Sequence, residues 1–436
     1  MTVTGASPRL PPGSTLPRAA LGVVVLTSRR RALQSLTRRY GSAFTVNLPM
    51  FGRCVFVSDP ALVRQLFLTS NEIVGNIDPN LGRILGPGSL FNLEGAEHHR
   101  TRRLLVPPFH GKRMSTYEQI VEEETLREAR SWPERQPFAM LPSTMRITLN
   151  AILRAVFGAE GAEFEQLRVL LPRFVELGSR LAVMPVLSRD LGTRSPGGRF
   201  MAYRAQFDEV IDTLVARALA DPGLAERDDV LALMLQSRYD DGERIGNRDL
   251  ADQLLTLLAA GHETTATTLA WTVERLRRHP ALLERLVAEA EDGGSELRAA
   301  TILEVQRSRS VIDLVGRHVH AESLELGEWR IPRGYNVMVA IGLVHENESV
   351  FPNASAFDPD RFLNVSPDYY AWVPFGGGTR RCIGAAFANM EMNVVLRTLL
   401  REFTLVPTNE RDERWHSRGV AFAPARGGRT VLARRR

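Results

Sequence analysis

Apolar residues recur at helical spacing through most of this chain of 436 residues. Periodic stretches follow one another from residue 60 to residue 307, and a further one lies near the C-terminus. A chain with this pattern folds around packed helices rather than around a large sheet. The predicted helices span residues 60–70, 114–132, 143–157, 201–220, 230–237, 248–278, 281–291 and 295–307, with a last long helix from about 383 to 400.

Strand character is confined to two stretches. Residues 43–58 read as a pair of strands, AFTVN and RCVFVS, joined by a turn at Pro49 and Gly52. Residues 315–339 return to strand character around a second turn. The sequence therefore predicts a small sheet assembled from two distant parts of the chain.

The domain organisation follows from composition. Residues 1–17 are rich in Pro, Gly and Ser and are expected to form a flexible tail. No internal repeat or interdomain linker interrupts the rest. We expect residues 18–436 to form one unit of mainly α class with a minor β-sheet region, its β-rich part at about 40–60 and 314–340.

Composition excludes several classes of protein. An apolar fraction of 44% with 24% charged residues is ordinary for a globular chain. Of 55 basic residues only Lys112 is a lysine, but the arginines are spread along the chain, so no nucleic-acid binding is expected. Two distant cysteines, Cys54 and Cys382, exclude a disulfide scaffold and a four-cysteine zinc site. Cys54 lies in a predicted strand and is interpreted as a small buried apolar residue.

The N-terminal region carries no secretory signal. Its longest apolar stretch, residues 19–26, is well short of the ~20 residues that span a bilayer, so no transmembrane segment is expected. Arg29, Arg30 and Arg31 follow, and then a helical pattern that ends at Tyr40. We interpret this part as the solvated first helix of a cytoplasmic protein; a short interfacial helix is the alternative.

The most informative segment is FGGGTRRCIG, from Phe375 to Gly384. Three glycines make a loop whose backbone can approach a flat ligand closely. Cys382 follows two arginines and opens a helix, where free N–H groups and the helix dipole stabilise a thiolate. A phosphate-binding loop would need a Gly-Lys-Ser/Thr ending, which is missing. A glycine turn before a helix with a buried cysteine is the plainer alternative.

A second segment, AGHETT, begins at Ala260 inside an apolar helical run. Gly261 costs the helix about 1 kcal/mol relative to alanine. The hydroxyl of Thr264 can donate to the carbonyl near residue 260. Together they would open a notch beside the carboxyl of Glu263, although packing alone is the alternative. A zinc-protease H-E-x-x-H motif would need a second histidine where the chain has Ala266.

Charged residues form a third pattern. Glu304 and Arg307 stand at i and i+3 of a predicted helix, a spacing that usually makes a surface ion pair. The segment FDPDRF that begins at Phe357 supplies a further arginine, Arg361.

These segments together resemble the cytochrome P450 family. FGGGTRRCIG matches the F-x-x-G-x-R-x-C-x-G signature at every fixed position, and the likeness extends over nearly the whole chain. The chain looks most like the soluble actinobacterial members, in particular the mycobacterial orphan members. The resemblance implies the P450 fold and a haem b cofactor whose iron is bound by Cys382 as thiolate.

The resemblance also implies residue roles. Glu263 and Thr264 would form the catalytic acid–alcohol pair that relays protons during oxygen activation. Glu304, Arg307 and Arg361 would form an inward network that holds the loop leading to the cysteine, and such a buried network needs every partner. The residues expected to hold haem are His98, Arg102, Ala260, Gly261, Arg317, Phe375, Gly376, Arg380, Cys382 and Gly384, with the three arginines pairing with its propionates.

The function implied is that of a haem-thiolate monooxygenase acting on a lipophilic substrate, since apolar stretches at 73–90 and 169–186 fall where this family has its pocket walls. A thiolate ligand favours cleavage of the O–O bond. The alternatives are a haem-thiolate peroxygenase or isomerase, and a non-enzymatic haem carrier or gas sensor. The acid–alcohol pair favours the monooxygenase over both.

Electrons are expected from a separate partner, because the sequence shows no flavin or iron–sulfur motif. The partner implied is a ferredoxin with its NAD(P)H-dependent reductase, and a monomer is expected. An acidic donor needs a basic surface over Cys382. The candidate residues are Arg100, Arg103, Lys112, Arg113 and Arg381.

Overall fold

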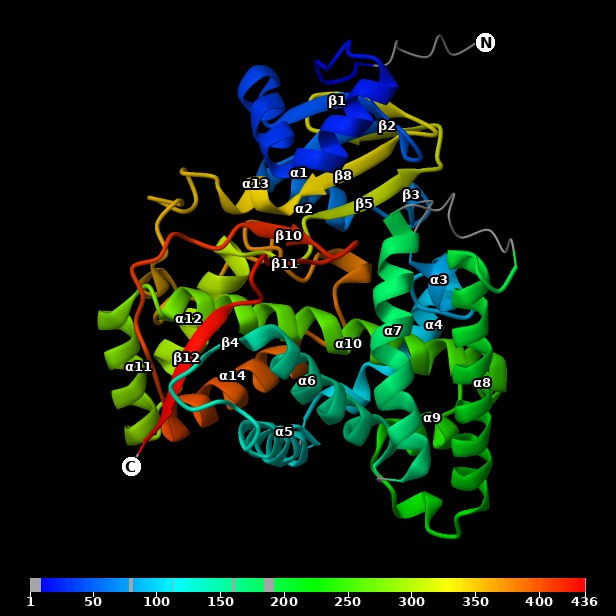
Figure 1. Ribbon diagram of the computed structural model, residues 1–436. Helices are drawn as coiled ribbons and strands as arrows, with labels where there is room; N and C mark the ends of the chain where they lie inside the picture. The colour runs from blue at the N-terminus through cyan, green and yellow to red at the C-terminus, as the bar shows by residue number, and fades with distance from the viewer. Residues whose placement is uncertain (1–8, 78–80, 112, 159–160, 184–191, 436) are drawn as a thin grey trace.

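Long helices make up most of the molecule, and a smaller β-rich lobe lies at one end of them (Figure 1). The computed structural model describes residues 9–77, 81–111, 113–158, 161–183 and 192–435. Within these ranges no helix is both long enough and apolar enough to cross a membrane. The helices are α1 (Arg18–Tyr40), α2 (Pro60–Leu68), α3 (Gly82–Leu85), α4 (Gly95–Leu105), α5 (Arg113–Ala129), α6 (Met140–Phe157), α7 (Ala162–Val183), α8 (Pro196–Ala220), α9 (Val230–Gln236), α10 (Asn247–Leu276), α11 (Pro280–Asp292), α12 (Glu296–Ser308), α13 (Ile341–His345) and α14 (Ala385–Glu402).

The main sheet has the strand order β1-β2-β8-β5-β3. Strands β2 and β8 pair in parallel, and the other pairs are antiparallel. A three-stranded sheet, β4-β12-β9, and the hairpins β6–β7 and β10–β11 complete the β structure. The strands are β1 (Ala43–Leu48), β2 (Gly52–Val57), β3 (Val74–Gly75), β4 (Pro137–Ala139), β5 (Leu314–Val319), β6 (Ser323–Leu326), β7 (Trp329–Pro332), β8 (Asn336–Ala340), β9 (Phe403–Leu405), β10 (Trp415–Ser417), β11 (Phe422–Pro424) and β12 (Arg429–Arg434).

Capping residues fix several helix starts. The side chain of Asp59 accepts a hydrogen bond from the N–H of Ala61 at 2.8 Å, and α2 begins at the intervening proline. Ser195 caps α8 in the same way by accepting from the N–H of Gly198 at 3.0 Å. The sequence prediction started α8 at residue 201, which was too late, because the Ser-Pro start signal precedes the apolar periodicity.

Four helices were not predicted from the sequence: α3 and α13, which are only four and five residues long, and the longer α4 and α7. α4 was missed because it is mostly polar and buries only His98, Thr101 and Leu105. α7 was missed because Pro172 lies inside it, and an interior proline normally ends a helix. The prediction of a mainly α fold with a minor sheet is nonetheless confirmed.

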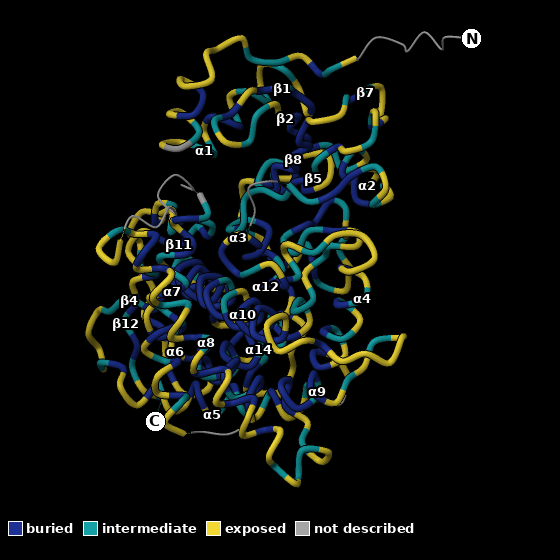
Figure 2. Tube along the Cα trace, turned by 90° about the vertical axis from the view of Figure 1, so that its right-hand side faces the viewer, coloured by how far each residue is buried: buried dark blue, intermediate teal, exposed yellow. Residues whose placement is uncertain are grey.

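α10 passes through the middle of the helical body and is buried along most of its length (Figure 2). Its first half packs in an apolar cluster with α6, α7, α8 and α9. Its second half packs in another cluster with α5, α6, α11, α12 and α14. Residues of α10 are therefore held from all sides.

The β-rich lobe packs a helix on each face of its sheet. Leu21 and Leu33 of α1 lie in one cluster with Phe44 and Phe56, while α2 covers the opposite face. Cys54 is fully buried in the α1 cluster, and burial raises the pKa of its thiol to about 12, so its interpretation as a buried apolar residue holds. The N-terminal segment also reaches this sheet.

The segment that reaches the sheet is part of the predicted flexible tail. The N–H of Ser14 donates to the carbonyl of Thr45 at 3.0 Å, and Gly13 forms a bridge with the same residue. The part of the tail from residue 9 is therefore bound to β1, and residues 1–8 lie outside the described residues.

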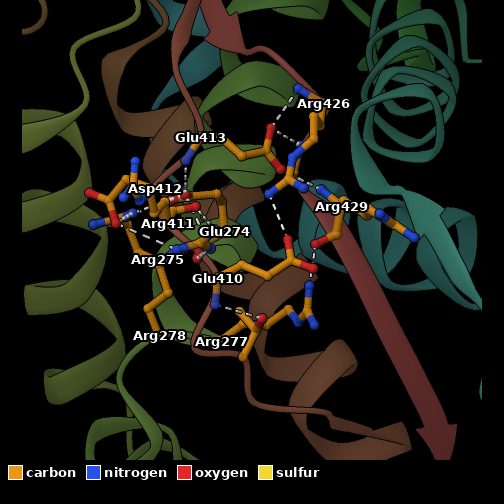
Figure 3. A network of polar contacts seen from close by, with 12 residues as sticks. Glu274, Arg275, Arg277, Arg278, Glu410, Arg411, Asp412, Glu413, Arg426 and Arg429 are labelled. Carbon is orange, nitrogen blue, oxygen red and sulfur yellow. Dashed lines mark hydrogen bonds and ion pairs between the residues drawn. The ribbon is translucent and has the colours of Figure 1, made fainter.

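A network of charges ties the C-terminal segment to the end of α10 (Figure 3). Buried Glu274 pairs with Arg275 at 2.5 Å and accepts from the N–H of Glu413 at 2.9 Å. The side chain of Glu413 accepts from three N–H groups in the turn before β12, the shortest at 2.6 Å from Arg426. The path of the chain on both sides of the β10–β11 hairpin is thereby fixed relative to α10.

Candidate active site

Cys382 lies in the loop that leads into α14. Its N–H donates to the carbonyl of Phe375 at 3.0 Å, which closes the loop. Gly376 and Gly378 both adopt φ of +66°, a conformation that favours glycine. A Cβ atom at Gly377 would overlap the ring of Phe67, so the loop also needs glycine to pack on the end of α2.

The thiol of Cys382 is accessible although protein surrounds it. Burial raises the pKa of this thiol, and the N–H of Gly384 together with Arg102 and Arg381 opposes that rise. The expected stabilisation of a thiolate at the helix start is therefore present but does not dominate. A bound metal ion removes the thiol proton outright. Nothing lies within 4 Å of a Cβ built at Gly384, which leaves open space beside the sulfur.

The segments before Cys382 are anchored by buried charges. Arg307 donates to both carboxylate oxygens of Glu304 at 2.7 Å, and Arg361 lies 3.2 Å from the same carboxylate. His345 accepts from the N–H of Val373 at 2.9 Å and so joins the cysteine loop to α13. The structure brings the three residues of the predicted network together.

Four cationic or basic side chains gather beside this loop. Arg317 is buried, and its guanidinium donates only to carbonyls, including that of Gly377 at 3.0 Å. Arg380 likewise donates to the carbonyls of Leu93 and Leu90. Burial, and after it Arg380, lowers the pKa of Arg317 to about 10. The three arginines predicted to bind the propionates, Arg102, Arg317 and Arg380, thus form one cluster with His98.

His98, rather than His99, faces this cluster. Burial lowers the pKa of His98 to about 3, with Arg380 and Arg102 as further causes, and its Nδ1 atom has no hydrogen-bond partner. His99 points outward to Asn71 at 2.8 Å. Across the described ranges, the arginines of the cluster form no ion pair with a carboxylate. Buried charges of one sign require a counter-ion, so the site fits a ligand that brings two carboxylates.

At the predicted notch α10 is accessible beside Thr264, whereas the carboxyl of Glu263, which was expected to line it, is buried. Ala260 is exposed and Gly261 and Thr264 are partly exposed, although the helix is buried on both sides of them. The hydroxyl of Thr264 donates to the carbonyl of Ala260 at 2.8 Å. A Cβ at Gly261 would lie 3.3 Å from Ile152, so the glycine also serves packing against α6.

Glu263 has a partner that the sequence did not indicate. Nε of Arg418 donates to Oε1 of this carboxylate at 2.8 Å. Burial raises the pKa of Glu263 despite the opposing guanidinium. Arg418 lies in the turn of the β10–β11 hairpin, far from α10 in sequence, so no local pattern could have found it.

The arginines proposed as a docking surface are already partly paired. Arg100 lies 2.9 Å from Asp241 and 3.0 Å from Glu243, and Arg103 lies 2.6 Å from Asp240. Of the three other candidates, the two within the described residues are not paired in this way. Arg381 lies over the ring of Tyr369 at 4.3 Å, Arg113 is partly buried, and Lys112 lies outside the described residues.

The fold and the site together define a haem-thiolate protein. The family model named Cytochrome P450 matches residues 11–427. Cytochrome P450 138 of Mycobacterium tuberculosis is 57% identical over 98% of this chain and 97% of that protein. Cytochrome P450 135B1 of the same organism is 37% identical over 96% of this chain and 90% of that protein.

Solved structures show the same fold. The structure titled retinoic acid bound cyanobacterial CYP120A1 has a TM-score of 0.86 at 23% identity and covers 98% of this chain and 100% of its own. The cytochrome P450DA heme domain has a TM-score of 0.85 at 22% identity, with 99% of both chains covered. The chain belongs to the cytochrome P450 family, as the resemblance predicted. It is a monooxygenase of the haem-thiolate class, and its cofactor is haem b.

Proposed function

We propose that this monooxygenase inserts one atom of O2 into a lipophilic substrate of sterol, fatty-acid or terpenoid type, with electrons from a ferredoxin and its reductase. The observation that carries the assignment of the site is the cluster of buried Arg317 with the partly buried Arg102 and Arg380 beside an accessible Cys382. A cysteine ligand and cationic anchors for two carboxylates are what haem b requires.

Each residue of the cluster takes one part in holding the cofactor. Cys382 binds the iron, and the three arginines with His98 bind the propionates. Gly384 and Gly376 would leave room for the cofactor, since a Cβ atom built at Gly384 meets nothing within 4 Å and one at Gly376 meets only Val315 at 3.9 Å. The bound haem supplies the oxygen chemistry, and the protein supplies position, protons and exclusion of water.

Proton delivery falls to the pair on α10. Because the hydroxyl hydrogen of Thr264 is donated to Ala260, the hydroxyl oxygen is left to accept a hydrogen bond from water or substrate. Oε1 of Glu263 is held by Arg418, so a proton on this acid resides on Oε2. Breaking the Arg418 contact frees the acid to turn toward Thr264.

The character of the notch supports a lipophilic substrate. The accessible part in the middle of α10 consists of Ala259, Ala260, Gly261 and Thr264 and carries no charged side chain. An unactivated C–H bond is best held by apolar walls with few polar anchors. Parts of the two apolar stretches predicted as pocket walls, residues 78–80 and 184–186, lie outside the described residues.

The position of α4 supports electron entry nearby. His98 and Arg102 of this helix belong to the arginine cluster and are buried and partly buried, while Arg103 on the same helix is exposed. An acidic donor bound at the exposed face would therefore lie one helix away from the cofactor. The ion pairs with Asp240 and Asp241 are exposed and weak, so a donor can displace them.

Two measurements test the proposal. The reduced CO complex of the purified protein should show the red-shifted Soret band of thiolate ligation, and Cys382→His should lose it. If Cys382→Ser binds haem and keeps the same band, Cys382 is not the ligand. With ferredoxin, reductase and ¹⁸O₂, a lipid-like substrate should gain one labelled oxygen. If only strongly hydrophilic compounds displace the iron-bound water, or the product oxygen comes from peroxide, the proposed reaction is wrong.

A further inference from the structure

The first 58 residues contain eight arginines and neither an aspartate nor a glutamate, the first acid being Asp59. The described part of this stretch forms α1, β1 and β2, which lie together at one end of the molecule (Figures 1 and 2). The rest of the chain balances its arginines with carboxylates, as the net charge of only +5 shows. The lobe is therefore a local concentration of positive charge.

Two of these arginines are neutralised from other parts of the chain. Arg9 pairs with Glu328 at 2.5 Å, and Arg30 pairs with Glu346. Arg29 is partly buried near Asp313. Five others are exposed, and in the ranges that the structure describes they form no ion pair with a carboxylate. These are Arg18, Arg31, Arg38, Arg39 and Arg53.

The same lobe exposes large apolar side chains. Val23 is 62% exposed, Leu16 56%, Val24 44% and Met50 40%. Leu21, on the other side of α1, is buried against the sheet, so the exposed valines point away from the lobe. Scattered single apolar residues need no explanation, but these four lie close in sequence to Arg18 and Arg53, which have no carboxylate partner in the described ranges. Arg38 and Arg39 lie beyond the kink of α1 at Ser28.

Contacts place the helix start and the β1–β2 turn side by side. Nε of Arg18 donates to the carbonyl of Leu48 at 3.0 Å. Gly22 packs so closely on Pro49 that a Cβ atom would overlap the proline ring. Met50 follows in this turn and adopts φ of +68°. The exposed apolar side chains and the arginine of the helix start therefore belong to one surface.

We propose that this surface, the α1 face, docks on an anionic bilayer. Such a surface binds an anionic bilayer when its apolar side chains enter the acyl boundary and its arginines meet the lipid phosphates. A nucleic acid would satisfy the arginines but would leave the valines and Met50 in water. The α1 face lies on the membrane without crossing it, in keeping with the absence of a spanning helix among the described residues. A lipophilic substrate would then be taken from the bilayer in which it dissolves.

The test is co-sedimentation of the holoenzyme with vesicles of phosphatidylcholine alone or with 30% phosphatidylglycerol (composition chosen on the order of that of bacterial leaflets). Binding to the anionic vesicles should be at least about tenfold stronger and should fall as salt rises. Val23→Ser with Val24→Ser should weaken it about tenfold, because buried apolar area is lost. Arg18→Gln with Arg53→Gln should weaken it by a similar factor, because these arginines flank the exposed apolar side chains.

Matched controls change equally exposed residues elsewhere. Val365→Ser with Val406→Ser, at 57% and 39% exposure, and Arg244→Gln with Arg248→Gln should leave vesicle binding unchanged. Equal binding to both vesicles, no binding to either, or equal losses in the controls would overturn the proposal. The proposal would also be overturned if the variant with serine at positions 23 and 24 bound anionic vesicles and a DNA duplex as well as the parent protein does. That result would indicate a general attraction to polyanions. Sedimentation needs no turnover, so failure of the proposed oxidation would not affect this result.

Discussion

Oε1 of Glu263 lies 2.8 Å from Nε of Arg418, although 155 positions separate the two residues. The hairpin turn that carries Arg418 is itself held to α7, since the N–H of Val420 donates to Oγ of Ser179 at 2.9 Å. Gly419 packs against the same serine too tightly for any side chain. The acid on α10 is therefore held by a turn whose position depends on a third element.

Replacing this arginine should shift the pH dependence of coupling. Burial raises the pKa of Glu263 and Arg418 lowers it, so Arg418→Gln should raise the pKa further. The measurement is the amount of product formed per NAD(P)H as a function of pH, from about pH 5 to 9, which is roughly the range in which a carboxyl with a raised pKa titrates. The part of this pH profile that reflects the titration of Glu263 should move to higher pH.

Two variants control this result. Arg414→Gln removes an exposed arginine from the segment leading into the same hairpin and should leave the profile in place. Arg418→Lys should restore it in part. A profile that does not move in Arg418→Gln, or that moves equally in Arg414→Gln, would show that the ion pair does not govern the acid.

Thr264→Ala should keep haem and substrate binding and divert electrons into peroxide. Loss of a positioned proton donor or acceptor reduces the rate by about 10²–10⁴. Thr268→Ala is the matched control, because Thr268 donates to the carbonyl of Thr264 at 3.1 Å in the same back-bonded way. Peroxide yield and product yield are measured together. Unchanged coupling in Thr264→Ala would rule out its role in the relay.

Glu304→Ala should destabilise the protein by about 3–5 kcal/mol, because it leaves buried Arg307 without its carboxylate. The exposed pair between Arg285 and Asp360, at 2.7 Å, is the comparison, and Arg285→Ala should cost less than about 1 kcal/mol. Denaturant unfolding of the holoenzyme gives both values. Equal losses in the two variants would contradict an inward network.

Asp240→Asn should speed reduction by an acidic ferredoxin, since Asp240 pairs with Arg103 and competes for it. Arg103→Gln should slow it, and both effects should shrink above 0.15 M salt, where the Debye length is about 8 Å. Asp292→Asn, an exposed acid at the end of α11, serves as the control. Rates that do not depend on salt would exclude electrostatic docking at α4.

The sequence predicted what local patterns encode. The α10 periodicity, the back-bond of Thr264 and the cysteine loop all depend on residues within about ten positions of one another. The buried pairing of Arg361 with Glu304 was also foreseen, but through family resemblance rather than spacing.

Contacts that depend on tertiary packing were not foreseen. The contact between Glu274 and Glu413 fixes the path of the C-terminal segment that contains the short strands β10 and β11. Arg418 lies between these two strands and is brought to Glu263 in this way. Arg100 and Arg103 were candidates for a basic docking surface, yet acidic residues of the turn after α9 pair with both. Neither partner has a periodic or motif signal, so only the assembled fold reveals them.

The clustering of Arg102, Arg317 and Arg380 has a consequence for the protein before it binds haem. Without haem, the protein holds three arginines together with no carboxylate paired to them in the described ranges, so α4 and the loop before α14 repel one another. Haem ends that repulsion, and a ligand that binds only the folded state stabilises it by mass action. We expect the haem-free chain to be cut by proteases at these segments. The supply of haem would then set how much of the protein survives.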